Sequence, residues 1–192
     1  MTRLTLVRHG RSAVDPTTAP HHWDLAPDAA PGLDALRGSG LLPRDGRWYS
    51  SPEPKALATA AALTDRPVIE VDDLREAERP ATWFDDAAEW VAVVHRSMTV
   101  PDESAVPGWE PATATRRRVV RAVRGMLDDP DRPAELVLVG HGTAWTLLIA
   151  ELTAGEPDLA AWERMTMPDI AVLDVPSSDA PAAVVRGFGD SD

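Results

Sequence analysis

The sequence predicts an α/β fold, a three-layer sandwich whose doubly wound sheet is mainly parallel and has an antiparallel edge. Short apolar runs typical of buried strands alternate with longer stretches of helical periodicity, which favours strands joined by crossover helices. The last two apolar runs are too close together for a helix to separate them, which favours a hairpin. The 192 residues suit one domain with a sizeable core.

The expected elements follow these patterns in order along the chain. The strands are predicted at 3–7, 47–51, 67–71, 135–139, 170–175 and 182–188. The helices are predicted at 33–41, 52–63, 84–98, 111–129 and 143–155; prolines near the first turn favour the start of the second, and Gly155 ends the last. The proline-rich segments 14–32 and 99–110 are expected to be loops. We therefore expect a single domain over 1–192, with a frayed tail at 186–192.

Composition and charge exclude several classes of function. The net charge of −12 opposes binding to nucleic acid or to an anionic membrane, but leaves room for a small anionic substrate if a few cations converge. The absence of cysteine excludes disulfides, thiolate metal sites and cysteine nucleophiles. No apolar run approaches the roughly 20 residues of a membrane span, and the N-terminal run lacks the layout of a signal peptide. The expected location is the cytoplasm.

Several predicted strands end in unusual polar groups. In open α/β sheets, ligands bind beyond the carboxyl ends of the strands. The helix that follows Gly142 would direct free N–H groups at an anion there. Such a set suits a phosphoryl group, because it offers cations and N–H donors for the oxygens, a nucleophile for phosphorus and an acid for the leaving oxygen. The strand ends are Arg8-His9-Gly10, Ser50-Ser51 with Lys55 just beyond, Leu74-Arg75-Glu76 and Gly140-His141-Gly142.

Four motifs, in order, give the chain a specific resemblance. "LVRHGRS", "SSPEPKALATA", "LREAE" and "VLVGHGTA" resemble the histidine phosphatase superfamily, which includes the cofactor-dependent phosphoglycerate mutases. The triplet "RHG" alone is a weak signal, whereas the four blocks in order and at this spacing are a strong one. The resemblance extends from residue 3 to about 175. It implies a phosphoglycerate mutase-like α/β sandwich, the fold that the element pattern predicts independently.

The resemblance implies a role for each matching residue. His9 matches the nucleophile that forms a phosphohistidine, which requires a neutral ring in one tautomer. Arg8 matches the arginine that clamps phosphate oxygens, and His141 matches the second histidine, which binds the phosphoryl group. Glu76 falls where the family often places its general acid. A general acid needs a raised pKa, and burial or the neighbouring Glu78 could raise that of Glu76.

Other matching positions are less regular. Lys55 stands where family members commonly carry a second clamping arginine, and an ammonium cannot make the forked contact of a guanidinium. Arg11 and Ser12 are expected either to contact substrate or to cap the following turn, and the backbone at Gly142 is expected to approach the ligand. Asp15 stands where an asparagine is common.

The activity that the resemblance implies is a metal-independent phosphatase without a cofactor. It would hydrolyse a phosphomonoester or other small phosphorylated molecule through phospho-His9. Two alternatives remain open. One is a phosphoglycerate-type mutase, which is disfavoured because the Gly-Trp-Glu-Gly stretch of mutases is missing after Glu76. The other is a degenerate member that binds a phospho-ligand without turnover, an idea motivated by Lys55 and Asp15.

The tryptophans and the paired histidines offer further candidates for the pocket. Trp90, Trp145 and Trp162 occupy helix-packing positions, whereas Trp23, Trp83 and Trp109 lie in or near loops and could line a substrate pocket. The pair at 21–22 could suggest a metal site. However, no further ligand spacing supports one, and a solvated loop is expected there.

Overall fold

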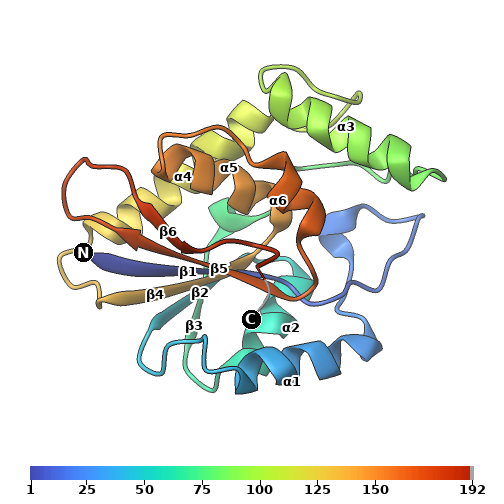
Figure 1. Ribbon diagram of the computed structural model, residues 1–192. Coiled ribbons are helices and arrows are strands. Elements are labelled where there is room, and N and C mark those ends of the chain that lie inside the picture. Colours follow the sequence, from blue (N-terminus) through green and yellow to red (C-terminus); the bar gives the residue numbers. More distant parts are fainter. Residues whose placement is uncertain (191–192) are drawn as a thin grey trace.

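One six-stranded sheet runs through the computed structural model, which describes residues 1–190 (Figure 1). Its order is β3-β2-β4-β1-β5-β6. The pairs β1–β4, β4–β2 and β2–β3 are parallel, whereas β5 runs antiparallel to both β1 and β6. The predicted sandwich, with its antiparallel edge, is therefore confirmed. The strands are β1 (Thr2–Arg8), β2 (Arg47–Ser50), β3 (Val68–Glu70), β4 (Glu135–Gly140), β5 (Asp169–Val175) and β6 (Ala183–Arg186).

Helices cover both faces of this sheet. On one face lie α1 (Ala30–Gly38) and α2 (Pro54–Leu63), and on the other lie α4 (Ala112–Asp128), α5 (Gly142–Leu152) and α6 (Leu159–Arg164) (Figure 1). Alternate side chains of β1 point to opposite faces, so Leu6 joins the core under α4 and α5, and Val7 joins the core over α1 and α2. The core is thus two apolar layers separated by the sheet.

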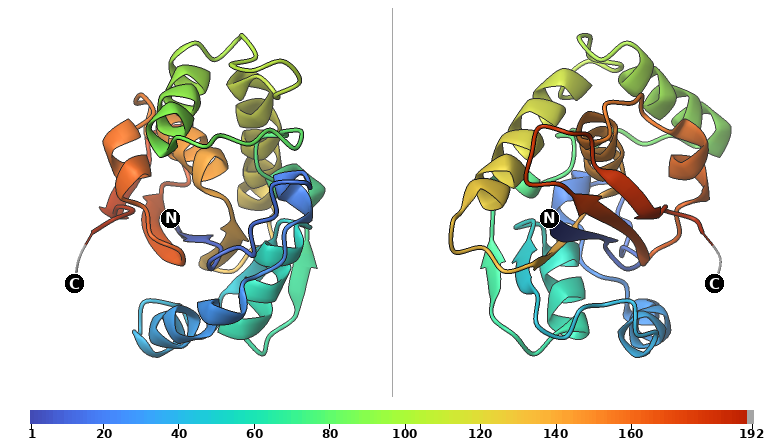
Figure 2. Two further views of the ribbon diagram at one scale, coloured as in Figure 1. Left: turned by 90° about the vertical axis from the view of Figure 1, so that its right-hand side faces the viewer. Right: turned by 60° about the vertical axis from the view of Figure 1, so that its left-hand side comes forward.

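The helix α3 (Ala87–Thr99) lies farther out, beside α4 and α5 rather than on the sheet (Figure 2). Its apolar face carries the buried Val94 and Met98, which join a third cluster with Trp109 and Leu147. Asp86 caps its start by accepting a hydrogen bond from the N–H of Ala88 at 2.8 Å. This outer helix forms one side of the cavity described below.

Several details differ from the predictions. The first helix spans Ala30–Gly38 rather than 33–41, and α5 ends at Leu152 rather than at Gly155. The helix α6 was not expected, because its six residues are too few to show a period; Asp158 caps it by accepting from the N–H of Ala161 at 2.8 Å. The expected frayed tail is wrong for the described residues 187–190. Phe188 is 2% exposed in the core, and the N–H of Gly189 donates to Asp169 at 3.0 Å. Residues 191–192 of that tail lie outside the described residues.

A buried arginine on α4 anchors the segment that follows β3. Arg118 donates to the backbone oxygens of Asp73, Arg75 and Glu76 at 3.0, 2.6 and 2.6 Å. It also pairs with the Glu110 carboxylate at 2.7 Å. The preceding residues Arg116 and Arg117 are half-buried and exposed, respectively. The Arg118 side chain, by contrast, is only 7% exposed. The contact fixes the backbone that carries Glu76.

We expect Arg118→Ala to lower the free energy of unfolding by about 2–4 kcal/mol, because it leaves the partly buried Glu110 carboxylate and several backbone oxygens without their partner. The exposed neighbour Arg117 supplies the control. Arg117→Ala should change the unfolding free energy by less than about 0.5 kcal/mol. Urea denaturation of the two variants checks both values, and equal losses would contradict the anchoring role.

Candidate active site

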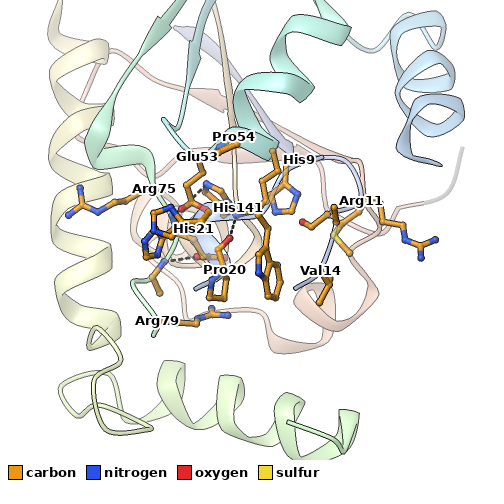
Figure 3. A pocket seen from close by; sticks show the side chains of 18 of the residues that line it. His9, Arg11, Val14, Pro20, His21, Glu53, Pro54, Arg75, Arg79 and His141 are labelled. Atoms are coloured by element: carbon orange, nitrogen blue, oxygen red, sulfur yellow. Dashed lines mark hydrogen bonds and ion pairs between the residues drawn. The ribbon is translucent and has the colours of Figure 1, made fainter. Parts of the chain in front are cut away.

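A cavity of about 1200 Å³ lies at the carboxyl ends of β1, β2 and β4 (Figure 3). Three chain segments wall it: the loop at 11–27, the start of α2, and the stretch from Asp72 to Trp90. Both histidines of the predicted site face it. The cavity therefore lies where parallel α/β sheets bind their ligands.

His9 follows directly on β1 and is 7% exposed. Its Nδ1 lies 2.7 Å from the backbone oxygen of Gly10. A carbonyl oxygen can only accept, so Nδ1 carries the proton and Nε2 keeps its lone pair. Burial lowers the pKa of His9 well below its usual value, and the nearby His141 lowers it further. His9 is therefore a neutral imidazole with Nε2 available as a nucleophile.

His141 ends β4 at the start of α5 and is fully buried. Its ring centroid lies 5.2 Å from that of His9, in an edge-to-face arrangement. Its Nε2 is 2.8 Å from Ser51 Oγ and 3.3 Å from Glu53 Oε1. Its Nδ1 has no hydrogen-bond partner among residues 1–190. The two strand ends thus bring the two histidines together, as predicted.

Lys55, on the first turn of α2, is 4% exposed. Its ammonium donates to Glu53 Oε2 at 2.5 Å and to the backbone oxygen of Pro20 at 2.6 Å. Burial opposes ionisation of Glu53, but His141 and Lys55 outweigh it and lower the pKa of this carboxyl. Lys55 therefore enters the site as half of a buried ion pair, and sequence reasoning missed its partner Glu53.

Glu76 occupies the place where we expected an anion-binding helix start. Its Oε1 accepts from the N–H groups of Ala77 and Ala144 at 2.9 and 3.0 Å, and its Oε2 accepts from Thr143 at 3.1 Å. The N-terminus of α5 is thus capped by the protein's own carboxylate. Burial alone would raise the pKa of Glu76, but Arg79, His141 and the N–H donors lower it overall. The expectation of a raised pKa is therefore wrong for the unliganded protein.

Arg8 and Gly142 lie together at the edge of the site. The Arg8 Nη1 donates to the backbone oxygen of Met165 at 2.9 Å, while Nε has no partner within the described chain. A Cβ at Gly142 would lie 3.4 Å from that Nε, at ordinary van der Waals distance, so Arg8 does not itself require glycine there. Arg8 lines both the main cavity and a smaller one of about 310 Å³ beside it, and Gly142 lines only the smaller one.

The other glycines of the two strand ends serve packing rather than ligand approach. A Cβ at Gly140 would lie 2.5 Å from the indole of Trp145, whose Nε1 donates to the backbone oxygen of Val7 at 2.9 Å. A Cβ at Gly10 would lie 2.9 Å from Leu25. Glycine is therefore needed at position 140, where the indole crosses, whereas at position 10 the end of the Leu25 side chain would have to shift.

Arg79 is a functional candidate that sequence reasoning missed. Its guanidinium is 8% exposed, donates to Thr143 Oγ1 at 2.9 Å, and lies 4.9 and 4.8 Å from the rings of Trp90 and Trp109. It lines the cavity on the side of α3 (Figure 3). The only signal in the sequence was its position three residues after Glu76.

The loop after "RHG" contributes less than its sequence suggests. Arg11 pairs with Asp28 at 2.8 Å, and both side chains are exposed. Figure 3 shows Arg11 extending away from the centre of the cavity. Ser12 forms an isolated β-bridge with Leu25 at the cavity wall. Asp15 accepts hydrogen bonds from the N–H and Oγ1 of Thr17, which directs its carboxylate into its own turn.

Aromatic side chains line the cavity away from the histidines. Trp23 and Trp83 line it from two loops, and Trp83 is 51% exposed. Trp109 is buried behind Arg79 and does not line it. His21 and His22, whose ring centroids are 4.0 Å apart, line the cavity from the same loop as Trp23.

Within residues 1–190, no group of three or more His, Asp or Glu side chains is arranged to hold a metal ion. None of the described helices has both the length and the apolar character needed to cross a membrane.

Comparison with known proteins agrees with this arrangement. The family model of the histidine phosphatase superfamily (branch 1) matches residues 4–185. The uncharacterized phosphatase PhoE of Bacillus subtilis is 26% identical over 174 residues, which cover 83% of this chain and 81% of that protein. YhfR of Bacillus stearothermophilus has the same fold, with a TM-score of 0.78 and 19% identity over 100% of this chain and 98% of its own. A mycobacterial glucosyl-3-phosphoglycerate phosphatase has a TM-score of 0.71 and 20% identity over 98% of this chain and 99% of its own.

An α/β sandwich with two histidines at adjacent strand ends defines the class of this protein. The chain belongs to the histidine phosphatase superfamily. The resemblance inferred from its four motifs is thereby confirmed.

Proposed function

We propose that this protein is a phosphatase that hydrolyses a small phosphomonoester through a phosphohistidine on His9. The observation that carries the proposal is the state of His9. Its Nδ1 proton is held by Gly10, its Nε2 lone pair is free, and burial keeps the ring neutral. Arg8, Lys55 and His141 surround it with groups that stabilise phosphoryl oxygens.

The proposed reaction has two steps, both in the cavity at the carboxyl ends of the strands. In the first, His9 Nε2 forms a bond to phosphorus while the bond to the leaving oxygen breaks, and Glu76 gives that oxygen a proton. In the second, a water molecule passes a proton back to Glu76 and attacks phosphorus. The bond to Nε2 then breaks, and inorganic phosphate leaves. Neither step requires a metal or a cofactor.

The size of the cavity supports a small-molecule substrate. A volume of about 1200 Å³ far exceeds a phosphoryl group, so much of it is available to the rest of the substrate. That part would lie against Trp23 and Trp83. The relatives with phosphatase names favour the same class of reaction, although their identities to this chain are low.

Hydrolysis of p-nitrophenyl phosphate by the purified protein, with trapping of the intermediate, tests the proposal. We expect turnover in a range of about pH 4 to 8 without added metal. We also expect a protein-bound phosphate that survives alkali and is lost in acid. Absence of turnover across this range would sink the phosphatase proposal. Absence of turnover combined with stabilisation by inorganic phosphate would identify a binding member instead.

A further inference from the structure

Glu53 touches three parts of the site although it is not one of the residues that the family motifs assign. It is 5% exposed. Its Oε2 accepts from the Lys55 ammonium at 2.5 Å, and its Oε1 accepts from the N–H of Glu76 at 2.8 Å. The same Oε1 lies 3.3 Å from Nε2 of His141. A buried carboxylate in these contacts acts on the imidazole next to it.

The position of the proton on His141 follows from this contact. The hydroxyl of Ser51, 2.8 Å from Nε2, can either donate or accept, so it does not decide the tautomer. An ionised Glu53 can only accept, and its pKa is lowered. The carboxylate therefore favours a proton on Nε2. In the neutral ring, Nδ1 is then unprotonated, and it is the nitrogen without a partner in the described structure.

A bound phosphoryl group changes the requirement at Nδ1. Phosphoryl oxygens are acceptors and repel a nitrogen lone pair, whereas a protonated Nδ1 donates to them. Burial lowers the pKa of His141, so the free protein holds a neutral ring at neutral pH. Binding of the anion must then bring one proton to Nδ1, and the resulting imidazolium needs a counter-charge on its other side.

We propose that Glu53 is a positioning residue that holds Nε2–H of His141 and stabilises the imidazolium that forms when the phosphoryl group binds. This inference rests on the proposed phosphatase function. It assigns the chain's unusual Lys55 a second task, because Lys55 keeps the Glu53 carboxylate ionised. The carboxylate thus acts on the reaction through His141 without touching the substrate.

Several other charged groups face His141 and set the direction of each effect. Glu53 before α2 and Glu76 before α3 raise its pKa, whereas Lys55 on α2 and Arg118 on α4 lower it. His9, which follows β1, lies 5.2 Å from His141 between ring centroids and is neutral. Removing the Glu53 carboxylate should therefore lower the pKa of His141.

The test is the pH dependence of kcat for p-nitrophenyl phosphate. If the protonated His141 is the active form in the complex, activity is lost as pH rises through its pKa. Glu53→Gln lowers that pKa, so the alkaline limb should move about one pH unit toward lower pH. A Glu53→Gln limb that stays in place, or that moves toward higher pH, overturns the inference.

The wild-type protein supplies a second measurement that needs no variant. Nitrogen NMR of the histidine rings should find His141 protonated only on Nε2 in the free protein. Both nitrogens should be protonated after addition of inorganic phosphate. A free protein with the proton on Nδ1 overturns the inference even if Glu53→Gln fails to fold.

The two proposals fail separately. Turnover of p-nitrophenyl phosphate with an unmoved alkaline limb would overturn the role of Glu53 and leave the phosphatase intact. Absence of turnover at every pH would overturn the phosphatase, and the NMR tautomer would still decide whether Glu53 orients His141.

Discussion

Replacement of His9 by alanine is expected to reduce kcat for p-nitrophenyl phosphate by about 10⁴-fold or more. The variant removes the nitrogen that forms the covalent bond, and water cannot use the oriented lone pair in its place. The phosphoenzyme should disappear as well. Arg8 and Lys55 remain in the variant, so inorganic phosphate should still protect it against thermal unfolding.

The control for His9 is another histidine outside the cavity. His95 lies on α3 and contacts Glu163 of α6 at 3.0 Å. His95→Ala should keep kcat within about twofold of wild type, since His95 lines neither of the two cavities described above. A His9→Ala protein that folds and retains a tenth of the wild-type kcat would rule out His9 as the nucleophile.

Glu76→Gln is expected to lower kcat by about 10²–10³-fold for an alkyl phosphate such as ethyl phosphate. An alkoxide leaves only with a proton, and the amide of glutamine cannot supply one. For p-nitrophenyl phosphate, whose leaving group departs as a stable anion, the loss in the first step, measured as the pre-steady-state burst of p-nitrophenolate, should be less than about tenfold. The ratio of the two losses isolates proton transfer from general damage to the site.

The lowered pKa of Glu76 sets a condition on this role. In the free protein the group is ionised at neutral pH. A bound phosphoryl group brings negative charge close to it and raises the pKa, which allows the carboxyl to hold the proton that it later donates. Its Oε2, which within residues 1–190 accepts only from the N–H of Thr143 at 3.1 Å, has a lone pair for that proton.

Glu78→Gln serves as the matched control, because Glu78 is exposed and two residues away. It should change neither substrate by more than about twofold. Equal losses for ethyl and p-nitrophenyl phosphate in Glu76→Gln would show that Glu76 holds the helix start but donates no proton.

The fold and the histidine pair could be predicted because their signals are local. The apolar runs at 3–7 and 135–139 form adjacent parallel strands, which places His9 and His141 at one sheet edge. No knowledge of distant contacts was needed for that step. The element pattern and the strand-end residues therefore predict the same α/β sandwich and the same pair of histidines as the four family motifs.

The rest of the site depends on contacts between distant segments. Glu53 was overlooked because nothing in its neighbourhood shows that its carboxylate meets the imidazole at the end of β4. Arg79 meets Thr143, which is 64 residues away in sequence. The pKa of Glu76 was predicted with the wrong sign because burial was counted without Arg79, His141 and the backbone N–H donors, all of which lower it. These contacts, and their effects on the pKa values, are set by tertiary packing and cannot be predicted from local sequence patterns.

The carboxylate at the start of α5 limits how this protein can change in evolution. Glu76 is at once the proposed proton donor and the acceptor for the N–H groups of Thr143 and Ala144 in the first turn of α5, which begins directly after His141. A mutation that removes the acid therefore also loosens the support of the second histidine. A lineage that abandoned catalysis but kept phosphate binding would have to rebuild that helix start, so loss of function and loss of architecture are tied together here.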